Sequence, residues 1–338
     1  MRKGHDLISV IVPTYNRAEM LKDALQTLLD QRTNGKFSFE IIVVNNASTD
    51  RTAAVLEEVQ KKHPLFLRYA YEENKGVADA MNRGIREARG EWLAFFDDDQ
   101  LAEEDWLEQL YEAAIQTGAS IVGGRVYLDL PPDELANIGN VCRRVLRENN
   151  FYDVVHKYEG KNLPGTGNVL VARKVFDSIG LFEVSGVLGT PDCDLFSRAG
   201  EAGFSMVFSP TAAIRHRISP ARLTAAYFKW DTLMIGKLLA YLDYKHKGMT
   251  QMLFFLAARI GQALLVNLPL LLIALIRQNS KEILDRKCLL WQAVGYVRVG
   301  FFFISPGLFA QEEFFANLDF RKGREILGPL DQEQKNRT

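Results

Sequence analysis

The sequence predicts an α/β fold, in which a mainly parallel sheet flanked by helices is followed by a helical, partly hydrophobic region. Short β-branched segments alternate with segments of helical apolar spacing, a pattern typical of a parallel sheet with crossover helices. After Ser219 and Pro220 the composition changes, and long apolar stretches begin. We therefore expect an α/β domain over residues 1–220 and a helical region over residues 221–338.

The expected elements follow one another in a repeating βα order, and right-handed crossovers should bring the strand ends to one edge of the sheet. Pro13 stops the first strand, Ser48 or Asp50 caps the second helix, and Gly90 ends the third. The expected strands cover residues 7–13, 39–44, 67–71, 92–96 and 119–127, and the expected helices cover residues 17–31, 50–62, 76–88 and 103–118.

Three consecutive carboxylates, Asp97, Asp98 and Asp99, follow the apolar segment Trp92–Phe96. Five apolar residues in a row suit a strand that is buried on both faces. Adjacent carboxylates repel one another unless a positive group lies among them, and α/β sheets bind ligands at the carboxyl ends of their strands. The pattern favours a divalent cation that carries a phosphorylated substrate. The alternative is a solvated turn whose aspartate caps the helix near Glu103.

Composition and missing motifs exclude several classes of protein. The formal net charge is −1 with both signs interspersed, so we expect no nucleic-acid partner. Cys142, Cys193 and Cys288 form no CxxC pair, which fits a reducing compartment, and the short apolar run before Pro13 is not a signal peptide. Neither a G-x-G-x-x-G after the first strand nor a Walker sequence occurs, which argues against an NAD-type enzyme.

Four segments together resemble the family 2 glycosyltransferases. They are SVIVPTYNR (Ser9–Arg17), VVNNASTD (Val43–Asp50), ENKGVADAMNRGIREARGEWLAFFDDD (Glu73–Asp99) and DCDLFSRAGEAG (Asp192–Gly203). The resemblance runs in order over roughly residues 9–216. It implies the GT-A fold, a nucleotide-sugar donor and inversion at the anomeric centre.

The resemblance also implies that the loops after the first two strands hold the nucleoside. Pro13, Thr14, Tyr15 and Arg17 would line the base and ribose pocket, although ordinary loop packing is the alternative for Tyr15 and Arg17. Asn45 stands where the family usually has an aspartate facing the base. Its amide oxygen still accepts a hydrogen bond, but without the assistance of a charge the bond should be weaker.

A second donor-binding segment is implied around Asn74, Gly76 and Arg83, which in the family approaches the base and phosphates. Backbone N–H groups at a helix start near Gly76 would favour an anionic phosphate. The guanidinium of Arg83 would bridge two phosphate oxygens. The alternative for Arg83 is a solvated helical side chain.

Asp97 and Asp99 correspond to the family's D-x-D motif. The resemblance implies that Asp99 binds Mg²⁺ or Mn²⁺ directly and that Asp97 serves the donor ribose or the metal shell. Asp98 is grouped with the donor-binding residues, although its side chain is expected to turn away. His216 follows the last strand, where it is a candidate metal ligand, and a structural histidine is the alternative.

Asp192 occupies the family's catalytic-base position at a helix start. It would take the proton from the acceptor hydroxyl, with Asp194 and Arg198 in supporting positions. Pro191 replaces the usual glutamate, and a proline is well tolerated in the first turn of a helix. The alternative is that Asp192 and Asp194 only cap the helix.

Two apolar stretches in the last third, residues 252–276 and 289–304, predict helices that associate with a membrane. Arg259 and Arg298 lie inside them, and basic residues flank both sides of the first stretch. Interfacial helices or a re-entrant hairpin satisfy this charge pattern better than a single crossing. The alternatives are a helical dimer interface and an added soluble subdomain.

The sequence therefore predicts an inverting, metal-dependent enzyme that moves one sugar from a nucleoside-diphosphate sugar, with UDP as the expected nucleotide. The acceptor would be a saccharide or lipid-linked molecule in polysaccharide or glycolipid biosynthesis at the cytoplasmic face of a membrane. No Q-x-x-R-W motif of the processive synthases is found. The alternatives are an inactive nucleotide-sugar-binding membrane scaffold and a sugar-1-phosphate nucleotidyltransferase. Homo-oligomerisation is left open.

Overall fold

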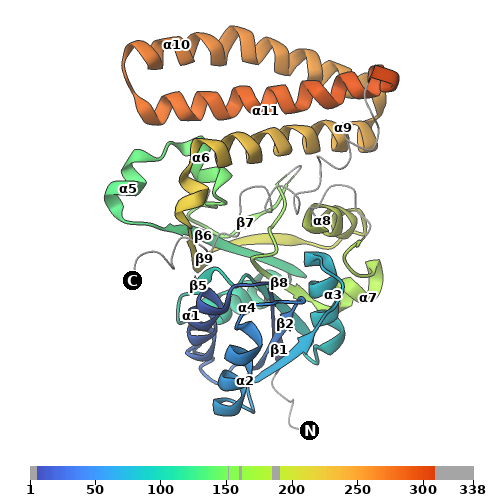
Figure 1. Ribbon diagram of the computed structural model, residues 1–338. Coiled ribbons are helices and arrows are strands. Elements are labelled where there is room, and N and C mark those ends of the chain that lie inside the picture. Colours follow the sequence, from blue (N-terminus) through green and yellow to red (C-terminus); the bar gives the residue numbers. More distant parts are fainter. Residues whose placement is uncertain (1–5, 151, 160–161, 185–190, 309–338) are drawn as a thin grey trace. The chain divides into compact units, whose positions relative to one another are not determined.

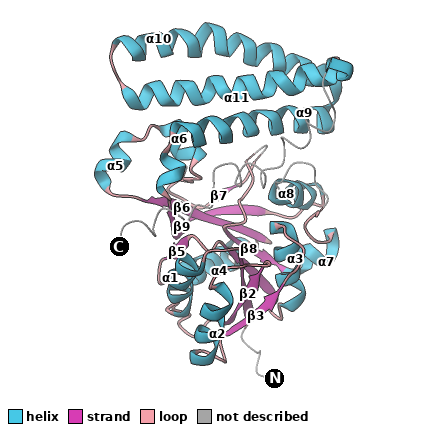
Figure 2. Ribbon diagram, viewed as in Figure 1, coloured by secondary structure: helices cyan, strands magenta, loops and turns pink. Residues whose placement is uncertain are grey.

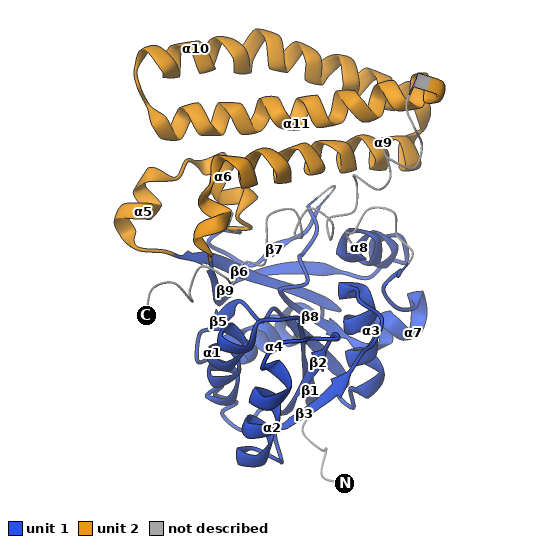
Figure 3. Cartoon of the chain, viewed as in Figure 1, with its two compact units in different colours: residues 1–129, 149–186, 190–217 blue, residues 130–148, 187–189, 218–338 orange. Residues whose placement is uncertain are grey.

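The computed structural model describes residues 6–150, 152–159, 162–184 and 191–308 of the 338-residue chain. Its contacts divide the chain into two units (Figure 3). The first comprises residues 1–129, 149–186 and 190–217, and the second comprises residues 130–148, 187–189 and 218–338. The part of the expected helical region beyond residue 308 lies outside the described residues.

A nine-stranded sheet organises the first unit, with the strand order β3-β2-β1-β4-β8-β6-β9-β5 and with β7 paired to β9 (Figure 1). Its strands are β1 (Leu7–Thr14), β2 (Ser38–Asn45), β3 (Leu67–Tyr71), β4 (Trp92–Phe96), β5 (Gln100–Ala102), β6 (Ile121–Asp129), β7 (His156–Lys157), β8 (Asn168–Ala172) and β9 (Met206–Arg217). The helices of this unit are α1 (Ala18–Leu29), α2 (Thr52–Lys62), α3 (Val77–Glu87), α4 (Trp106–Thr117), α7 (Arg173–Ile179) and α8 (Pro191–Glu201).

The α/β class predicted from the sequence is confirmed, and the parallel part of the sheet is β3-β2-β1-β4. Beyond β4 the sheet is mixed, because β8 pairs antiparallel with both β4 and β6. A short antiparallel strand, β5, begins directly after the acidic cluster and pairs with β9.

Helices cover both faces of the sheet (Figure 2). Ala94 and Phe96 of β4 belong to the core cluster shared with α1, α2 and α4, whereas Leu93 and Phe95 belong to the cluster shared with α3, α7 and α8. Successive side chains of a strand point to opposite faces, so β4 is buried on both sides. This burial fixes the position of the residues that follow Phe96.

The second unit is helical and includes a segment, residues 130–148, that the sequence analysis assigns to the α/β domain. Its helices are α5 (Pro132–Asn137), α6 (Asn140–Val145), α9 (Ala225–Gln262), α10 (Leu268–Ile276) and α11 (Ser280–Ile304). Asp285 of α11 accepts hydrogen bonds from the backbone N–H groups of Val141 and Cys142, at 3.1 and 2.9 Å. These long-range contacts explain why the segment joins the second unit.

Helix α9 contains a break at Gly248, whose φ of 76° lies in the left-handed region that glycine adopts without strain. Its second half continues through a π-helical turn, Ala263–Asn267, into α10. By length and composition, Ala225–Ile276 and Ser280–Ile304 qualify as candidate membrane spans, each containing an 18-residue window whose mean hydropathy is 1.9 in the first and 1.2 in the second.

Candidate active site

The acidic cluster lies at the carboxyl end of β4 and contacts the loop after β1. The Oγ1 of Thr14 donates to Asp98 Oδ2 at 2.7 Å. The Nη1 of Arg17 contacts Asp98 Oδ1 at 2.7 Å and Asp99 Oδ2 at 2.8 Å. Asp98 and Asp99 are each 5% exposed, so these contacts form in a nearly dry environment. The structure thus brings Thr14 and Arg17 to Asp98 and Asp99, which follow more than 80 residues later in the sequence.

The charges of this cluster are unbalanced. Burial, followed by repulsion from Asp99 and Asp98, raises the pKa of Asp97 to about 7. Burial also raises the pKa of Asp98, against the opposing effect of Arg17. Burial lowers the pKa of Arg17, but the nearby Asp98 and Asp99 outweigh burial and raise it. One guanidinium therefore faces three carboxylates, and the excess negative charge suits a cation.

His216 and Gly167 complete the surroundings of the cluster. His216 lies opposite Gln100 in the β5–β9 pairing, is 4% exposed, and places Nε2 3.6 Å from Asp99 Oδ2. The side-chain amide of Gln100 donates to Asp97 Oδ2 at 3.4 Å. A Cβ at position 167 would overlap the Asp97 carboxylate and the Gln100 amide. Only a glycine fits there without displacing them.

These residues fit a divalent cation that is shared with a ligand. Within the described ranges, no group of three or more His, Cys, Asp and Glu side chains is arranged to enclose a metal. Mg²⁺ usually keeps several waters and uses only one or two carboxylates together with substrate phosphates. Asp97 and Asp99 supply carboxylates of that kind, and the raised pKa of Asp97 indicates a need for positive charge.

The loops after β1, β2 and β3 are fastened to one another by asparagines. The side chain of Asn46 donates to the backbone oxygens of Glu72 and Asn74, at 3.2 and 2.6 Å, and accepts from Gly76 N at 2.8 Å. Asn74 in turn donates to Glu72 Oε1 from its backbone and its side chain, both at 2.9 Å. Asn46 therefore fixes the predicted donor segment. It was not singled out from the sequence, although its place directly after a strand end was the available signal.

Asn45, the predicted contact of the base, also has a local role. Its Oδ1 accepts from Ser48 N at 3.0 Å, so the side chain closes the turn after β2. In the β1–β2 register Asn45 lies opposite Thr14, which binds the acidic cluster. Pro13 precedes Thr14 as a buried β1 residue opposite Val44.

Tyr15 is 44% exposed, which leaves its ring available at the surface of the same loop. Lys75 Nζ lies 5.3 Å from the centre of this ring and 3.3 Å from its hydroxyl oxygen. The pair joins the loop after β1 to the loop after β3. A planar ring with a nearby cation is suited to stacking against a nucleobase and to attracting phosphate.

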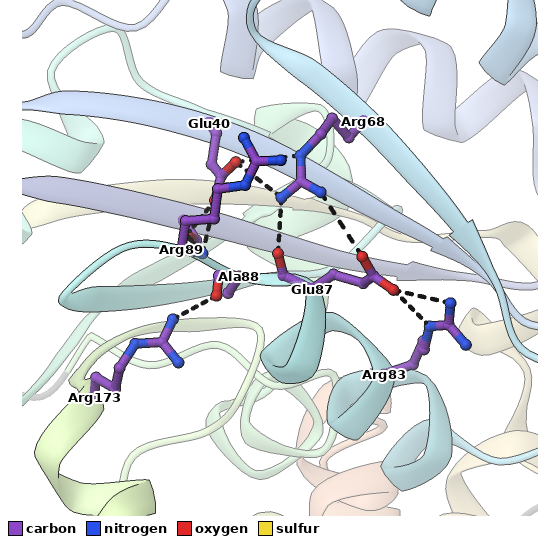
Figure 4. Close-up of polar contacts among 8 residues, drawn as sticks. Glu40, Arg68, Arg83, Glu87, Ala88, Arg89 and Arg173 are labelled. Atoms are coloured by element: carbon purple, nitrogen blue, oxygen red, sulfur yellow. Dashed lines mark hydrogen bonds and ion pairs between the residues drawn. The ribbon is translucent and has the colours of Figure 1, made fainter.

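Arg83 contacts a carboxylate of its own helix. Its Nε and Nη2 lie 3.0 and 2.9 Å from Glu87 Oε1 (Figure 4). Glu87 Oε2 lies 3.7 Å from Arg68 Nη1, which places Arg83 in a network with Arg68. Donor binding through Arg83 would exchange the partly exposed Glu87 pair for a phosphate, and the phosphate contact that the resemblance implies stays a prediction.

Asp192 lies in the first turn of α8, where its Oδ1 accepts a hydrogen bond from Cys193 N at 2.9 Å. Arg198 holds this helix: it pairs with Asp194 at 2.7 Å and donates to the backbone oxygens of Ile179 and Leu181, at 2.6 and 2.9 Å. Leu195, Phe196 and Ala199 of α8 share a core cluster with Phe95 of β4. The core that positions the acidic cluster therefore also anchors the helix of Asp192, and the base role stays a prediction.

Comparison with known proteins gives a family match and several relatives. The model of the family "Glycosyl transferase family 2" matches residues 9–179, which is just over half of the chain. Glycosyltransferase AglE of Haloferax volcanii is 29% identical over 202 residues, 60% of this chain and 64% of that protein. Succinoglycan biosynthesis protein ExoM of Rhizobium meliloti is 29% identical over 224 residues, 65% of this chain and 70% of that protein.

Solved structures resemble this one over most of its length. A mannosyltransferase, PcManGT of Pyrobaculum calidifontis, in complex with GDP-Man and Mn²⁺, has a TM-score of 0.58 at 19% identity and covers 87% of this chain and 88% of its own. Residues 1–349 of S. aureus TarS give a TM-score of 0.51 at 16% identity, covering 88% of this chain and 91% of their own. The fold is therefore shared. Because the family model matches residues 9–179 and the carboxylates lie at the strand end, we conclude that this chain belongs to glycosyl transferase family 2.

Proposed function

We propose that this protein is an inverting, metal-dependent glycosyltransferase that moves a single sugar from a nucleoside-diphosphate sugar to a saccharide or lipid-linked acceptor. The observation that carries the proposal is the acidic cluster at the end of β4. Three carboxylates face one guanidinium there, and the pKa of Asp97 is raised to about 7. A cation carrying a diphosphate would neutralise this charge, which supports Asp97 and Asp99 as the cation's protein ligands, with His216 beside Asp99.

The base, the cation ligands and the nucleoside-binding loops would each have a separate role in the reaction. Asp192 would accept the proton of the acceptor hydroxyl while that oxygen attacks the anomeric carbon from the face opposite the diphosphate. The new bond joins the acceptor oxygen to the anomeric carbon. The bond to the diphosphate breaks, and the nucleoside diphosphate leaves with the electron pair. A bound cation would supply positive charge for this leaving group.

The loops after β1, β2 and β3 would bind the nucleoside. Thr14 and Asn45 end β1 and β2, Tyr15 begins the loop after β1, and Asn46 fastens the loop after β2 to Asn74 and Gly76. We propose UDP as the nucleotide. Residues 1–349 of TarS have been solved with UDP-GlcNAc, and PcManGT with GDP-Man and Mn²⁺. The two neighbours differ in their base, so a guanine donor is the competing outcome of the test.

We further propose that the product belongs to a surface polysaccharide or glycolipid and that the enzyme works at the cytoplasmic face of a membrane. The name of ExoM, a succinoglycan biosynthesis protein, supports the first point. The two long apolar helical segments of the second unit support the second. A lipid-linked acceptor would be presented at such a surface.

The test is turnover of a panel of UDP-, GDP- and dTDP-sugars in the presence of Mg²⁺ or Mn²⁺, with and without EDTA. We expect one donor to be used, and EDTA and the Asp99→Ala variant to abolish its use. Asp192→Asn should reduce transfer by about 10²–10⁴-fold, the usual contribution of a general base, while donor binding is retained.

Asp153→Asn is the matched control, because the side chain of Asp153 is 97% exposed and lies outside the cluster. It should leave turnover unchanged. Binding of no donor with either metal would contradict the proposal. Full transfer by Asp192→Asn would remove the assignment of the base.

A further inference from the structure

The π-helical turn Ala263–Asn267 and the helix α10 carry an apolar surface that no described residue covers. Leu265 is 79% exposed and Ile276 is 83% exposed. We name this surface the outer face; it consists of Leu264, Leu265, Leu268, Leu272, Leu275 and Ile276, each at least 41% exposed. Exposed apolar surfaces of this extent are rare on soluble monomers and mark sites of interaction.

Two polar side chains beside this surface, those of Arg259 in α9 and Asn267, contact α11 instead. Arg259 lies 4.5 Å from the centre of the Tyr296 ring, and the Tyr296 hydroxyl donates to the buried Asp243 at 3.0 Å. Asn267 is 4% exposed and lies 3.5 Å from Arg286. The segment is therefore amphipathic in an inverted sense, with polar side chains inside and leucines outside. Such a pattern suits an apolar environment outside the protein.

The neighbouring helix shows how the segment can meet that environment. Because α10 turns directly into α11 and Asn267 contacts Arg286, residues 267–276 run beside residues 280–286. If α10 crossed a bilayer, these charged turns of α11 would be drawn into the hydrocarbon, which is costly. If the helices lie parallel to the membrane surface, only the outer face enters it.

The charges at this end of α10 suit an anionic surface. Arg277, Lys281 and Lys287 are exposed. The acidic groups nearby are already used, since Glu282 pairs with Arg286 at 3.6 Å and Asp285 accepts from backbone N–H groups. The accessible charge beside the outer face is therefore positive, as on proteins that bind anionic headgroups.

We propose that the outer face binds the surface of an anionic lipid bilayer, with α10 parallel to the membrane plane and with Arg277, Lys281 and Lys287 among the headgroups. Membrane binding through this face is independent of sugar transfer, and only the use of a lipid-linked acceptor rests on the proposed function. The surface would hold the enzyme where such an acceptor resides without α10 crossing the bilayer.

The test measures binding of the full chain to phosphatidylcholine vesicles with and without phosphatidylglycerol. Leu265→Glu and Ile276→Glu should each lower the partition coefficient by about tenfold or more, since each removes an apolar side chain that would enter the membrane and adds a charge. Leu65→Glu is the matched control, because Leu65 is 90% exposed in the first unit. It should bind as the wild type does, and equal losses in all three variants would overturn the proposal.

Three further measurements separate the competing outcomes. Lys281→Gln with Lys287→Gln should weaken binding to the anionic vesicles by about fivefold per lysine and leave binding to neutral vesicles unchanged. Alkaline carbonate should release the protein from membranes, whereas retention would indicate a crossing helix and overturn the orientation. Sedimentation without lipid tests whether the outer face instead binds a second copy of the chain. A dimer that Leu265→Glu dissociates, together with no vesicle binding by the wild type, would overturn the membrane assignment. Asp99→Ala should bind vesicles normally, which separates this test from that of the catalytic proposal.

Discussion

The sheet of the first unit buries acidic side chains at both of its ends, but the carboxylates at the two ends differ in how fully hydrogen bonds and ion pairs compensate their charge. At the amino ends of β1 and β2, Glu40 is 8% exposed and accepts from Ser9 Oγ at 2.8 Å and Arg89 N at 2.9 Å through Oε1. Its Oε2 lies 3.0 Å from Arg68 Nη2. Figure 4 shows how Arg68 also reaches the backbone oxygen of Glu87, which ties the end of α3 to the sheet.

The pKa values of the two clusters differ in direction for this reason. Burial raises the pKa of Glu40, but the hydrogen bonds from Arg89, Ser9 and Arg68 outweigh burial and lower it. At the other end of the sheet, burial and neighbouring carboxylates raise the pKa of Asp97 to about 7. A carboxylate that the fold satisfies stabilises the fold. A buried carboxylate that the fold leaves in excess marks a functional site.

The largest expected effect is the loss of activity when a carboxylate of the acidic cluster is neutralised. Asp97→Asn removes a charge that the fold does not need but the donor complex does, so turnover should fall by about 10²–10³-fold, as for other groups that stabilise developing charge. The free energy of unfolding should stay the same or rise, because repulsion among the three carboxylates is relieved. Steady-state kinetics and chemical denaturation of the same preparation measure both quantities. Wild-type turnover, or a large loss of stability, would contradict the contrast.

Glu40→Gln should have the opposite result. The variant removes the nearer of the two carboxylates around Arg68 and leaves only that of Glu87, at 3.7 Å. Losing a charged hydrogen-bond partner of this kind typically costs about 1–3 kcal/mol. Turnover below the melting transition should be unchanged. Glu58→Gln is the matched control, because the side chains of the Glu58–Lys62 pair are 57% and 65% exposed and exposed pairs of this kind contribute little to stability. Equal losses in the free energy of unfolding for the two variants would show that the buried Glu40 contributes no more to stability than an exposed glutamate does.

The stability that Glu40 confers should depend on pH. Its pKa in the folded state lies below the ordinary value of 4.5, so between these two values the unfolded chain binds more protons than the folded chain. The contribution is complete above pH 4.5 and is lost as the pH falls through the folded pKa. Denaturation of wild type and Glu40→Gln over a pH series should show their difference shrinking on the acid side. A difference that grows there would reverse the sign.

Much of this organisation could be predicted from the sequence. The strand ends and the run from Trp92 to Asp99 carry local signals of period and punctuation, and β3 begins and ends at the predicted residues. The helix limits are less exact: the second helix begins after Arg51, and the third ends at Glu87, before Gly90. The mixed half of the sheet could not be predicted, because the antiparallel insertion of β8 between β4 and β6 depends on long-range pairing. For the same reason the contacts that group residues 130–148 with the second unit could not be predicted: their partners, such as Asp285, lie far along the sequence.

The candidate site shows the same limit. The carboxylates of Asp97–Asp99 were visible as a run, but the ion pairs of Arg17 with Asp98 and Asp99 join residues about 80 positions apart. A family motif gives a residue's position and not its hydrogen-bond partner, so it assigned Arg17 to the nucleoside pocket and passed over Asn46. Partners follow from the packing of the loops, and only the fold supplies that.

Substitution of Arg83 should have the smallest effect on stability. It also tests directly whether this side chain belongs to the Glu40 cluster or binds the donor phosphates at the other end of the sheet. Its side chain is 40% exposed and pairs with Glu87, which Arg68 contacts from the Glu40 cluster. If it belongs to that cluster, Arg83→Gln should lower the free energy of unfolding by less than about 0.5 kcal/mol, the usual worth of an exposed pair. The KM for the donor should then be unchanged. A rise in KM of about tenfold, with stability unchanged, would support the phosphate contact of Arg83. A tenfold loss of affinity corresponds to about 1.4 kcal/mol of binding free energy. Arg86→Gln, on the same helix, is the control for a general loss of positive charge near the donor.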